Sequence, residues 1–113
     1  GKHSRDFTFI ENVVQANIKA ALSDNKEAVN QVYNVAYGEN TSLNQLVEAL
    51  INGLKALQIN PSASNINHGP DRAGDVKHSL ADVSKANNLI GYKPLYSFEE
   101  GIKQTIAWYC NDK

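Results

Sequence analysis

A short loop in the second half of the chain carries residue types that could bind a phosphate and a sugar. It reads Arg72-Ala73-Gly74-Asp75. An arginine guanidinium can donate two charge-assisted hydrogen bonds to phosphate oxygens, and a glycine lets the backbone approach a ligand closely. An aspartate carboxylate can accept hydrogen bonds from ribose hydroxyls. The same loop also fits a solvated arginine and an aspartate that caps a turn, so the motif alone leaves both interpretations open.

A second candidate site lies near the start of the sequence, at Arg5, Asp6 and Phe7. The arginine could bind a phosphate, while the aromatic ring two positions later could cover a base or a ribose. The alternative is an ion pair at the edge of a strand. Such an exposed pair contributes only about 0 to 1 kcal/mol to stability.

Several other kinds of site are not predicted by the composition or the motifs. The chain has 113 residues and a formal net charge of -1, so no broad basic surface is expected to attract nucleic acid or an anionic membrane. The apolar runs are too short to span a bilayer, and we expect a cytoplasmic protein. One cysteine and three scattered histidines predict neither a disulfide nor a metal site.

The motifs of oxidoreductase and hydrolase catalysis are also absent from the sequence. It contains no G-x-G-x-x-G loop to hold a pyrophosphate. It contains no Gly-x-Ser-x-Gly motif either. We therefore assign no catalytic residue and no cofactor-binding residue to these 113 residues.

The elements that must hold the two candidate sites alternate between helix and strand. Apolar residues at helical spacing predict four helices, at about residues 11–23, 43–57, 81–89 and 98–109. Aromatic and β-branched residues predict three short strands, at about residues 7–10, 32–36 and 65–68. This alternation is typical of the α/β class.

Local signals mark the ends of the predicted helices. Thr41 or Ser42 can supply an N-cap oxygen for the longest helix. Gly91 is a C-cap for the third helix, and Ser97 with Glu100 forms a capping box that opens the last one.

The order of these segments resembles a known family. The pattern includes Arg5-Asp6-Phe7, Tyr33-Asn34-Val35-Ala36, Arg72-x-Gly74-Asp75-Val76, Ala81-Asp82, Gly91-Tyr92-Lys93-Pro94 and Glu100-Gly101. In this order it resembles the C-terminal part of the extended short-chain dehydrogenases/reductases, the NAD-dependent nucleotide-sugar epimerases and dehydratases. Within that family, the run from Arg72 to Ser79 and the closing Trp108-Tyr109 look most like UDP-N-acetylglucosamine 4-epimerases.

The resemblance implies roles for four residues. Arg5 and Arg72 would bind the substrate diphosphate, Asp75 would bind the uridine ribose, and Phe7 would line the same pocket. NAD and the Ser/Thr, Tyr and Lys catalytic residues would belong to an N-terminal Rossmann domain that the 113 residues do not include. We therefore expect no NAD to bind to this chain alone.

Residues 1–113 would then be the substrate-binding part of a UDP-hexose or UDP-N-acetylhexosamine 4-epimerase, an isomerase that is inactive without the rest of the enzyme. The start of the sequence looks like a cut inside a larger protein. Two alternatives stay open. The chain could be the same part of a nucleotide-sugar 4,6-dehydratase or decarboxylase, because the phosphate clamp is shared, or a non-enzymatic interaction module, because a fold does not determine a function.

The resemblance also has a consequence for residues 11–36. In the family this helix and strand complete the sheet of the Rossmann domain. Without that sheet, the apolar face at Val14, Ile18 and Leu22 would lack a partner. We expect these side chains either to pack within the chain in a way foreign to the family or to form a contact between two chains.

Overall fold

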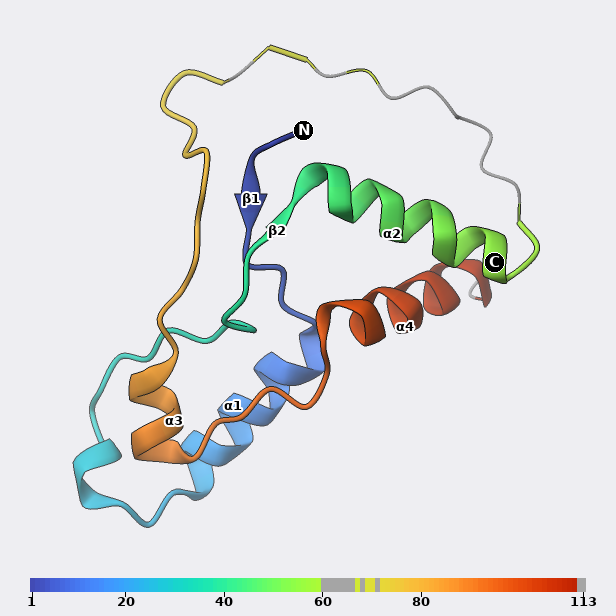
Figure 1. The fold of residues 1–113 in the computed structure, drawn as a ribbon. Helices are drawn as coiled ribbons and strands as arrows, with labels where there is room; N and C mark the ends of the chain where they lie inside the picture. Colours follow the sequence, from blue (N-terminus) through green and yellow to red (C-terminus); the bar gives the residue numbers. More distant parts are fainter. Residues whose placement is uncertain (60–66, 68, 71, 112–113) are drawn as a thin grey trace.

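A computed structural model describes residues 1–59, 67, 69, 70 and 72–111 of the 113-residue chain (Figure 1). The described part forms four α-helices, one short 3-10 helix and two short strands. In chain order they are β1 (Ser4–Arg5), α1 (Ile10–Leu22), η1 (Lys26–Ala28), β2 (Thr41–Ser42), α2 (Leu43–Ala56), α3 (Ser84–Ile90) and α4 (Phe98–Asn111). The predicted α/β class and its four helices are confirmed.

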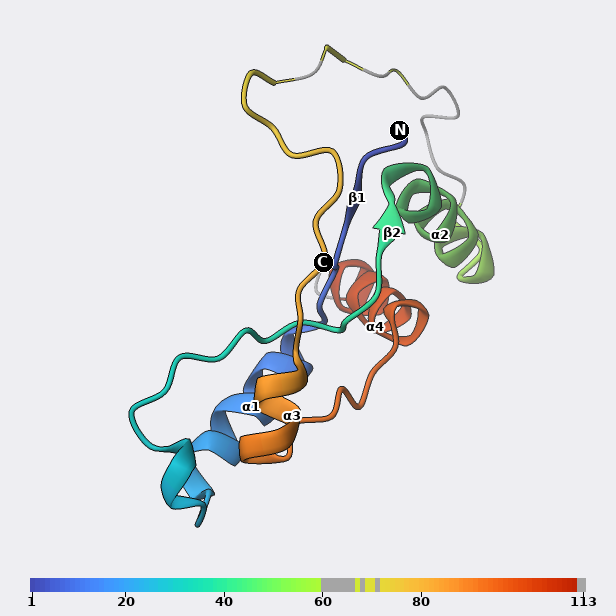
Figure 2. The same ribbon diagram turned by 60° about the vertical axis from the view of Figure 1, so that its left-hand side comes forward.

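The helices lie in two pairs, and the small sheet leads directly into one of them. In Figures 1 and 2, α1 packs with α3, and α2 packs with α4. β1 and β2 pair antiparallel, with Ser4 opposite Ser42 and Arg5 opposite Thr41, and β2 runs directly into α2. The radius of gyration is 16.9 Å, against about 13 Å expected for a compact domain of this length. The two helix pairs therefore do not share one central core.

The strands differ from the sequence prediction. The first strand of the structure is β1, which ends at Arg5. Residues 7–9, where the sequence predicted a strand, have no regular structure, and Ile10 already begins α1. Residues 32–36 are irregular, and Val32 is 84% exposed. No described strand lies beside these residues, and strand propensity has no effect without a neighbour that completes the hydrogen bonds. The strand predicted at residues 65–68 lies outside the described residues, apart from residue 67.

The predicted helix caps are confirmed. Ser42 Oγ accepts a hydrogen bond from Gln45 N at 3.1 Å, and Gln45 Oε1 accepts one from Ser42 N at 2.8 Å. Ser97 and Glu100 form the same kind of reciprocal box, at 3.1 and 3.3 Å. Gly91 ends α3 in the left-handed conformation with a φ of 70°, which favours glycine.

The third helix begins three residues later than predicted. Asp82 Oδ1 accepts a hydrogen bond from Ser84 N at 2.9 Å and so closes a local turn before the helix. The first helical bond then runs from Asn87 N to Val83 O, at 3.0 Å. The side-chain turn at Asp82 competes with helix formation at residues 81–83.

The main apolar core lies between α1 and α3. Its buried members are Ala16, Ala28, Ala86, Ile90 and Tyr92. Tyr92 is fully buried, and its hydroxyl donates a hydrogen bond to Ala36 O at 2.7 Å. Burial raises the pKa of Tyr92, and the negative charge of Asp6 raises it further, so the phenol stays a donor at neutral pH.

A buried amide joins α1 to the segment before α4. Asn12 is fully buried, and its Nδ2 donates to Tyr96 O at 2.9 Å. Its Oδ1 accepts from Leu95 N at 2.9 Å and from Tyr96 N at 3.1 Å. One side chain therefore satisfies three backbone groups that are far away in sequence.

The outer face of α1 has no partner within the described chain. Val14, Ile18 and Leu22 are exposed there. The expectation that they pack within the chain in an unusual way is therefore wrong, and the contact between two chains stays a prediction. None of the described helices has the length and hydropathy needed to cross a membrane. The cytoplasmic location also stays a prediction.

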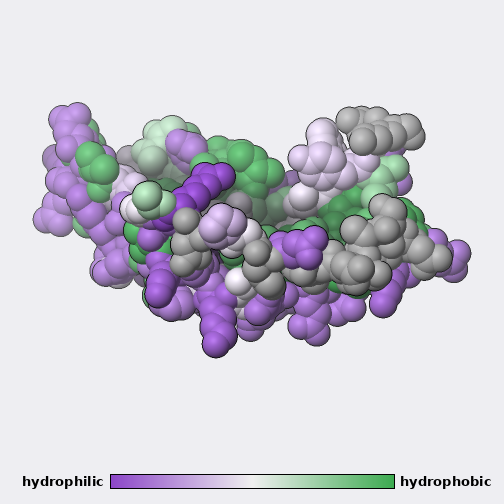
Figure 3. Space-filling view, turned by 90° about the horizontal axis from the view of Figure 1, so that it is seen from above, coloured by the Kyte–Doolittle hydropathy of each residue, from purple (hydrophilic) through white to green (hydrophobic). Residues whose placement is uncertain are grey.

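A groove of about 700 Å³ lies between α2 and α4. Its lining includes Gly53, Phe98, Ile102 and Ile106 together with three glutamates, Glu39, Glu48 and Glu99. In the view from above in Figure 3, apolar residues are visible in the hollowed centre of this face, and hydrophilic residues are most frequent along its lower edge. None of the four candidate residues lines this groove.

Candidate functional site

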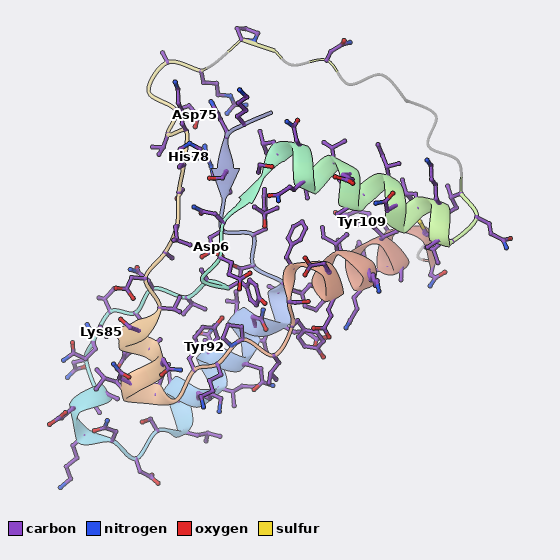
Figure 4. The ribbon with its side chains drawn as sticks, viewed as in Figure 1. Asp6, Asp75, His78, Lys85, Tyr92 and Tyr109 are labelled. Carbon is purple, nitrogen blue, oxygen red and sulfur yellow. The ribbon has the colours of Figure 1, made fainter. Side chains whose placement is uncertain are left out.

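Strand β1 lies beside residues 75–79, and this arrangement brings the two candidate loops together. Ser4 N donates to Lys77 O at 2.8 Å, and Ser79 N donates to Ser4 O at 3.1 Å. These bonds form a parallel bridge between Ser4 and His78. The Ser4 hydroxyl also lies 2.8 Å from His78 Nδ1. Figure 4 shows Asp75 and His78 on the segment that runs along β1.

Arg5 and Asp75 form an ion pair at this contact. Arg5 Nη2 donates to Asp75 Oδ1 at 2.8 Å. Arg5 Nη1 donates to Ser4 O at 2.7 Å and to Lys77 O at 3.3 Å. The two charged side chains are 32% and 34% exposed, so a ligand can reach them from solvent. A guanidinium has five N–H groups, and Arg5 keeps donors for such a ligand.

Arg72 and Asp75 lie on one tight turn. Asp75 N donates to Arg72 O at 3.1 Å. Gly74 takes a φ of 79° within this turn, a conformation that other residues adopt at a cost. The Arg72 side chain is exposed. The structure thus brings Arg5, Arg72 and Asp75 to the same edge of the molecule.

Phe7 packs elsewhere. Its ring centroid lies 5.9 Å from that of Phe98, at the start of α4. It also lines a small pocket with residues of the same helix, including Gly101. Phe7 therefore contacts α4, and the structure does not bring it together with the three charged candidates.

Asp6 is not the ion-pair partner of Arg5 that the sequence suggested. Its two carboxylate oxygens accept hydrogen bonds from Tyr37 N at 3.0 Å and from Gly38 N at 2.9 Å. Asp6 thereby ties the end of β1 to a turn more than thirty residues away. No local motif marks this role of Asp6 or the contact of His78 with β1, so neither could be found from the sequence.

Tyr37, on this turn, is influenced by the carboxylates of a nearby glutamate and of two glutamates in the first turn of α4. Removal from water raises its pKa, and the negative charges of Glu39, Glu99 and Glu100 raise it further. The Tyr37 phenol therefore stays protonated at neutral pH and can donate a hydrogen bond. It offers no negative charge that would repel an anionic ligand.

The fold is that of the C-terminal part of an extended short-chain dehydrogenase/reductase of the nucleotide-sugar epimerase and dehydratase class. More narrowly, the chain belongs to the GDP-mannose 4,6 dehydratase family, whose model matches residues 1–105. The resemblance noted in the sequence is thus confirmed for the family. The matches include dehydratases and several epimerases and do not single out a UDP-N-acetylglucosamine 4-epimerase.

Several characterised proteins are similar to the chain. A dTDP-glucose 4,6-dehydratase of Xanthomonas campestris pv. campestris is 32% identical over 117 residues, which cover 100% of this chain and 32% of the relative. A UDP-N-acetylglucosamine 4-epimerase from Methanobrevibacter ruminantium, solved with UDP-N-acetylmuramic acid, superposes with a TM-score of 0.82. It is 35% identical, and the match covers 100% of this chain and 33% of the epimerase.

A second similar structure contains a cofactor. MoeE5 in complex with UDP-glucuronic acid and NAD superposes with a TM-score of 0.78 at 26% identity. The match covers 100% of this chain and 35% of MoeE5. The chain thus spans about a third of the length of the relatives it matches.

Proposed function

We propose that residues 1–113 are the substrate-binding part of an NAD-dependent UDP-hexose or UDP-N-acetylhexosamine 4-epimerase. The observation that carries the proposal is the position of Arg5, Arg72 and Asp75 at one solvent-exposed edge, with Arg5 and Asp75 2.8 Å apart. Two arginines can match the charge of a diphosphate, and one carboxylate can accept from the adjoining ribose. The epimerase from M. ruminantium supports the choice of substrate.

The chain would bind and orient the nucleotide and leave the chemistry to another part of the polypeptide. NAD would supply hydride transfer when bound. The residues of this chain do not fit its pyrophosphate, because the N-termini of α2 and α4 are closed by their own Ser42 and Ser97 caps. Residues 6–9, directly before α1, contain no glycine, and Phe9 is the N-cap residue. We derive no step of hydride transfer for this chain.

A 4,6-dehydratase is the second candidate. It is favoured by the matched family model and by the relative from X. campestris. The same three charged residues would then hold a nucleoside diphosphate sugar with a different base or sugar. The two candidates share the binding role and differ in the reaction of the whole enzyme.

Arg72→Ala tests the binding role. We expect the substitution to weaken binding of UDP-N-acetylglucosamine by about 10- to 100-fold, because a hydrogen bond to a charged group contributes about 1.5–3 kcal/mol. Isothermal titration calorimetry on this chain measures the change. Lys55→Ala is the matched control, since it removes an exposed cation from the last turn of α2 and should leave the affinity unchanged.

Equal affinities for the Arg72→Ala variant and the unmodified chain would contradict the assigned phosphate contact. Absence of any measurable UDP-sugar binding by the folded, unmodified chain would contradict the proposed function as a whole.

A further inference from the structure

Helix α1 carries an apolar stripe that no other part of the described chain covers. Four large apolar side chains, spaced four residues apart, lie along one face of the helix: Ile10, Val14, Ile18 and Leu22. They are between 46% and 75% exposed. Single exposed apolar side chains are ordinary on a protein surface, whereas a continuous stripe is typical of an interface.

The groove between α2 and α4 matches this stripe in length and in shape. Its lining on α2 extends over twelve residues, from Gln45 to Leu57, and Ile10 and Leu22 are also twelve residues apart. At about 1.5 Å per residue, both surfaces are about 18 Å long. Small side chains such as Ala49 line the groove on α2, so a third helix can approach closely. A long open groove of this kind fits an amphipathic helix.

The groove has a negatively charged half. α2 and α4 run side by side in the same direction and begin near the sheet (Figures 1 and 2). The half of the groove nearest the sheet carries three carboxylates, from Glu39, Glu48 and Glu99. Within the described residues, none of the three forms an ion pair. This half of the groove therefore favours a partner that brings a cation.

The charges of α1 match the groove when the two run in opposite directions. Glu11 lies in the first turn of α1, and Lys19 lies in the last. An antiparallel α1 places its Lys19 beside the three carboxylates and its Glu11 toward Lys103, a lysine that lines the groove further along α4. The antiparallel direction also brings opposite ends of the helix dipoles together.

We infer that one copy of this chain places the apolar stripe of α1 in the α2–α4 groove of a second copy, with the helices antiparallel. The donor helix and the acceptor groove are different surfaces, so the contact is heterologous. One helix face in one groove buries less than a standard interface, so we expect a dissociation constant of roughly 10–100 μM. This association goes beyond the proposed nucleotide binding and uses none of its charged residues.

The stripes of two copies could instead pack against each other. Such an isologous contact would use α1 twice and would leave groove residues such as Asn52 without a role. The two arrangements therefore differ in their response to a substitution in the groove.

Analytical ultracentrifugation of the chain and of two variants tests the inference, at concentrations up to about 1 mM, well above the expected dissociation constant. Ile18→Asp puts a charge in the stripe, and Asn52→Arg puts a bulky cation in the groove, where it would also repel Lys19. Both positions are exposed, so the fold should be kept. Each variant should associate at least about tenfold more weakly, because the contact would desolvate the added charge. Mixed in equal amounts, the two variants should form a dimer, since one keeps the groove and the other keeps the stripe.

A charge exchange tests the antiparallel direction. Lys19→Glu and Glu48→Lys should each weaken association by about three- to fivefold, the upper range for an exposed pair, and a mixture of the two should restore it. Asn88→Arg is the matched control for the groove variant. It adds the same cation at an exposed position of α3 that lines neither surface, and association should not change.

Three results would overturn the inference. The unmodified chain could stay monomeric at the highest concentration, Asn52→Arg could associate as strongly as the unmodified chain, or the mixture of Ile18→Asp and Asn52→Arg could fail to dimerise. Far-UV circular dichroism checks that each variant is folded. Val14→Asp takes the place of Ile18→Asp if the latter is unfolded, because Val14 lies on the same stripe.

Discussion

Tyr92→Ala is expected to lower the free energy of unfolding by about 3–5 kcal/mol, the range for removing a large aromatic ring from a packed core. Tyr92 is fully buried in the cluster between α1 and α3. The substitution leaves a cavity among small residues such as Ala16 and Ala86, which cannot fill it. It also leaves Ala36 O without its donor. Urea unfolding followed by far-UV circular dichroism measures the loss.

Tyr92→Phe separates the ring from the hydroxyl. This variant keeps the packing and removes only the hydrogen bond to Ala36 O, so the expected loss is about 1–2 kcal/mol. If Tyr92→Ala cost no more than Tyr92→Phe, the ring would not be a core residue, and the described packing between α1 and α3 would be wrong.

Asn12→Ala is expected to cost about 2–4 kcal/mol, because three backbone groups lose their partner in a site without exposure. Those groups belong to Leu95 and Tyr96, in the segment that leads into α4. The better helix propensity of alanine offsets only a few tenths of this loss. Urea unfolding again gives the free-energy difference.

Asn17 offers a matched control on the same helix. It is exposed, and its side chain bonds only to Val13 O within α1, at 2.9 Å. Asn17→Ala should therefore change stability by less than about 0.5 kcal/mol. Similar losses at both positions would mean that Asn12 stabilises the helix locally and does not join it to the segment before α4.

These two side chains also matter for the proposed site. The Tyr92 hydroxyl donates a hydrogen bond to Ala36 O. The backbone N–H groups of the next two residues, Tyr37 and Gly38, donate hydrogen bonds to the Asp6 carboxylate. Asp6 directly follows Arg5 in the chain. The core between α1 and α3 thus supports the strand that presents Arg5, and loosening of this core should weaken nucleotide binding as well.

The helices could be predicted from the sequence because their signals are local. The capping boxes at Ser42 and Ser97 act within three residues, and Gly91 ends α3 by its own backbone conformation. The strands could not be predicted in the same way. Residues 32–36 have strand propensity, yet a strand forms only where a second segment completes its hydrogen bonds.

In the candidate site, too, local contacts could be predicted from the sequence and contacts between distant segments could not. Arg72 and Asp75 share a turn, so their proximity follows from a spacing of three residues. The contact between Arg5 and Asp75 joins residues 70 apart, and only the family resemblance suggested that they belong together. The sequence left an ion pair with Arg5 as one alternative for Asp6, because charge alone cannot reveal the two backbone amides that the fold brings to this carboxylate.

The most direct test of the central claim is an amide NMR titration of this chain with UDP. If the edge formed by β1 and the turn at Gly74 binds the nucleotide, the largest chemical-shift changes should fall on Gly74, Asp75 and Lys77, and Arg72→Ala should abolish them. Changes centred instead on Gly53 and Phe98, in the groove between α2 and α4, would contradict the proposed site.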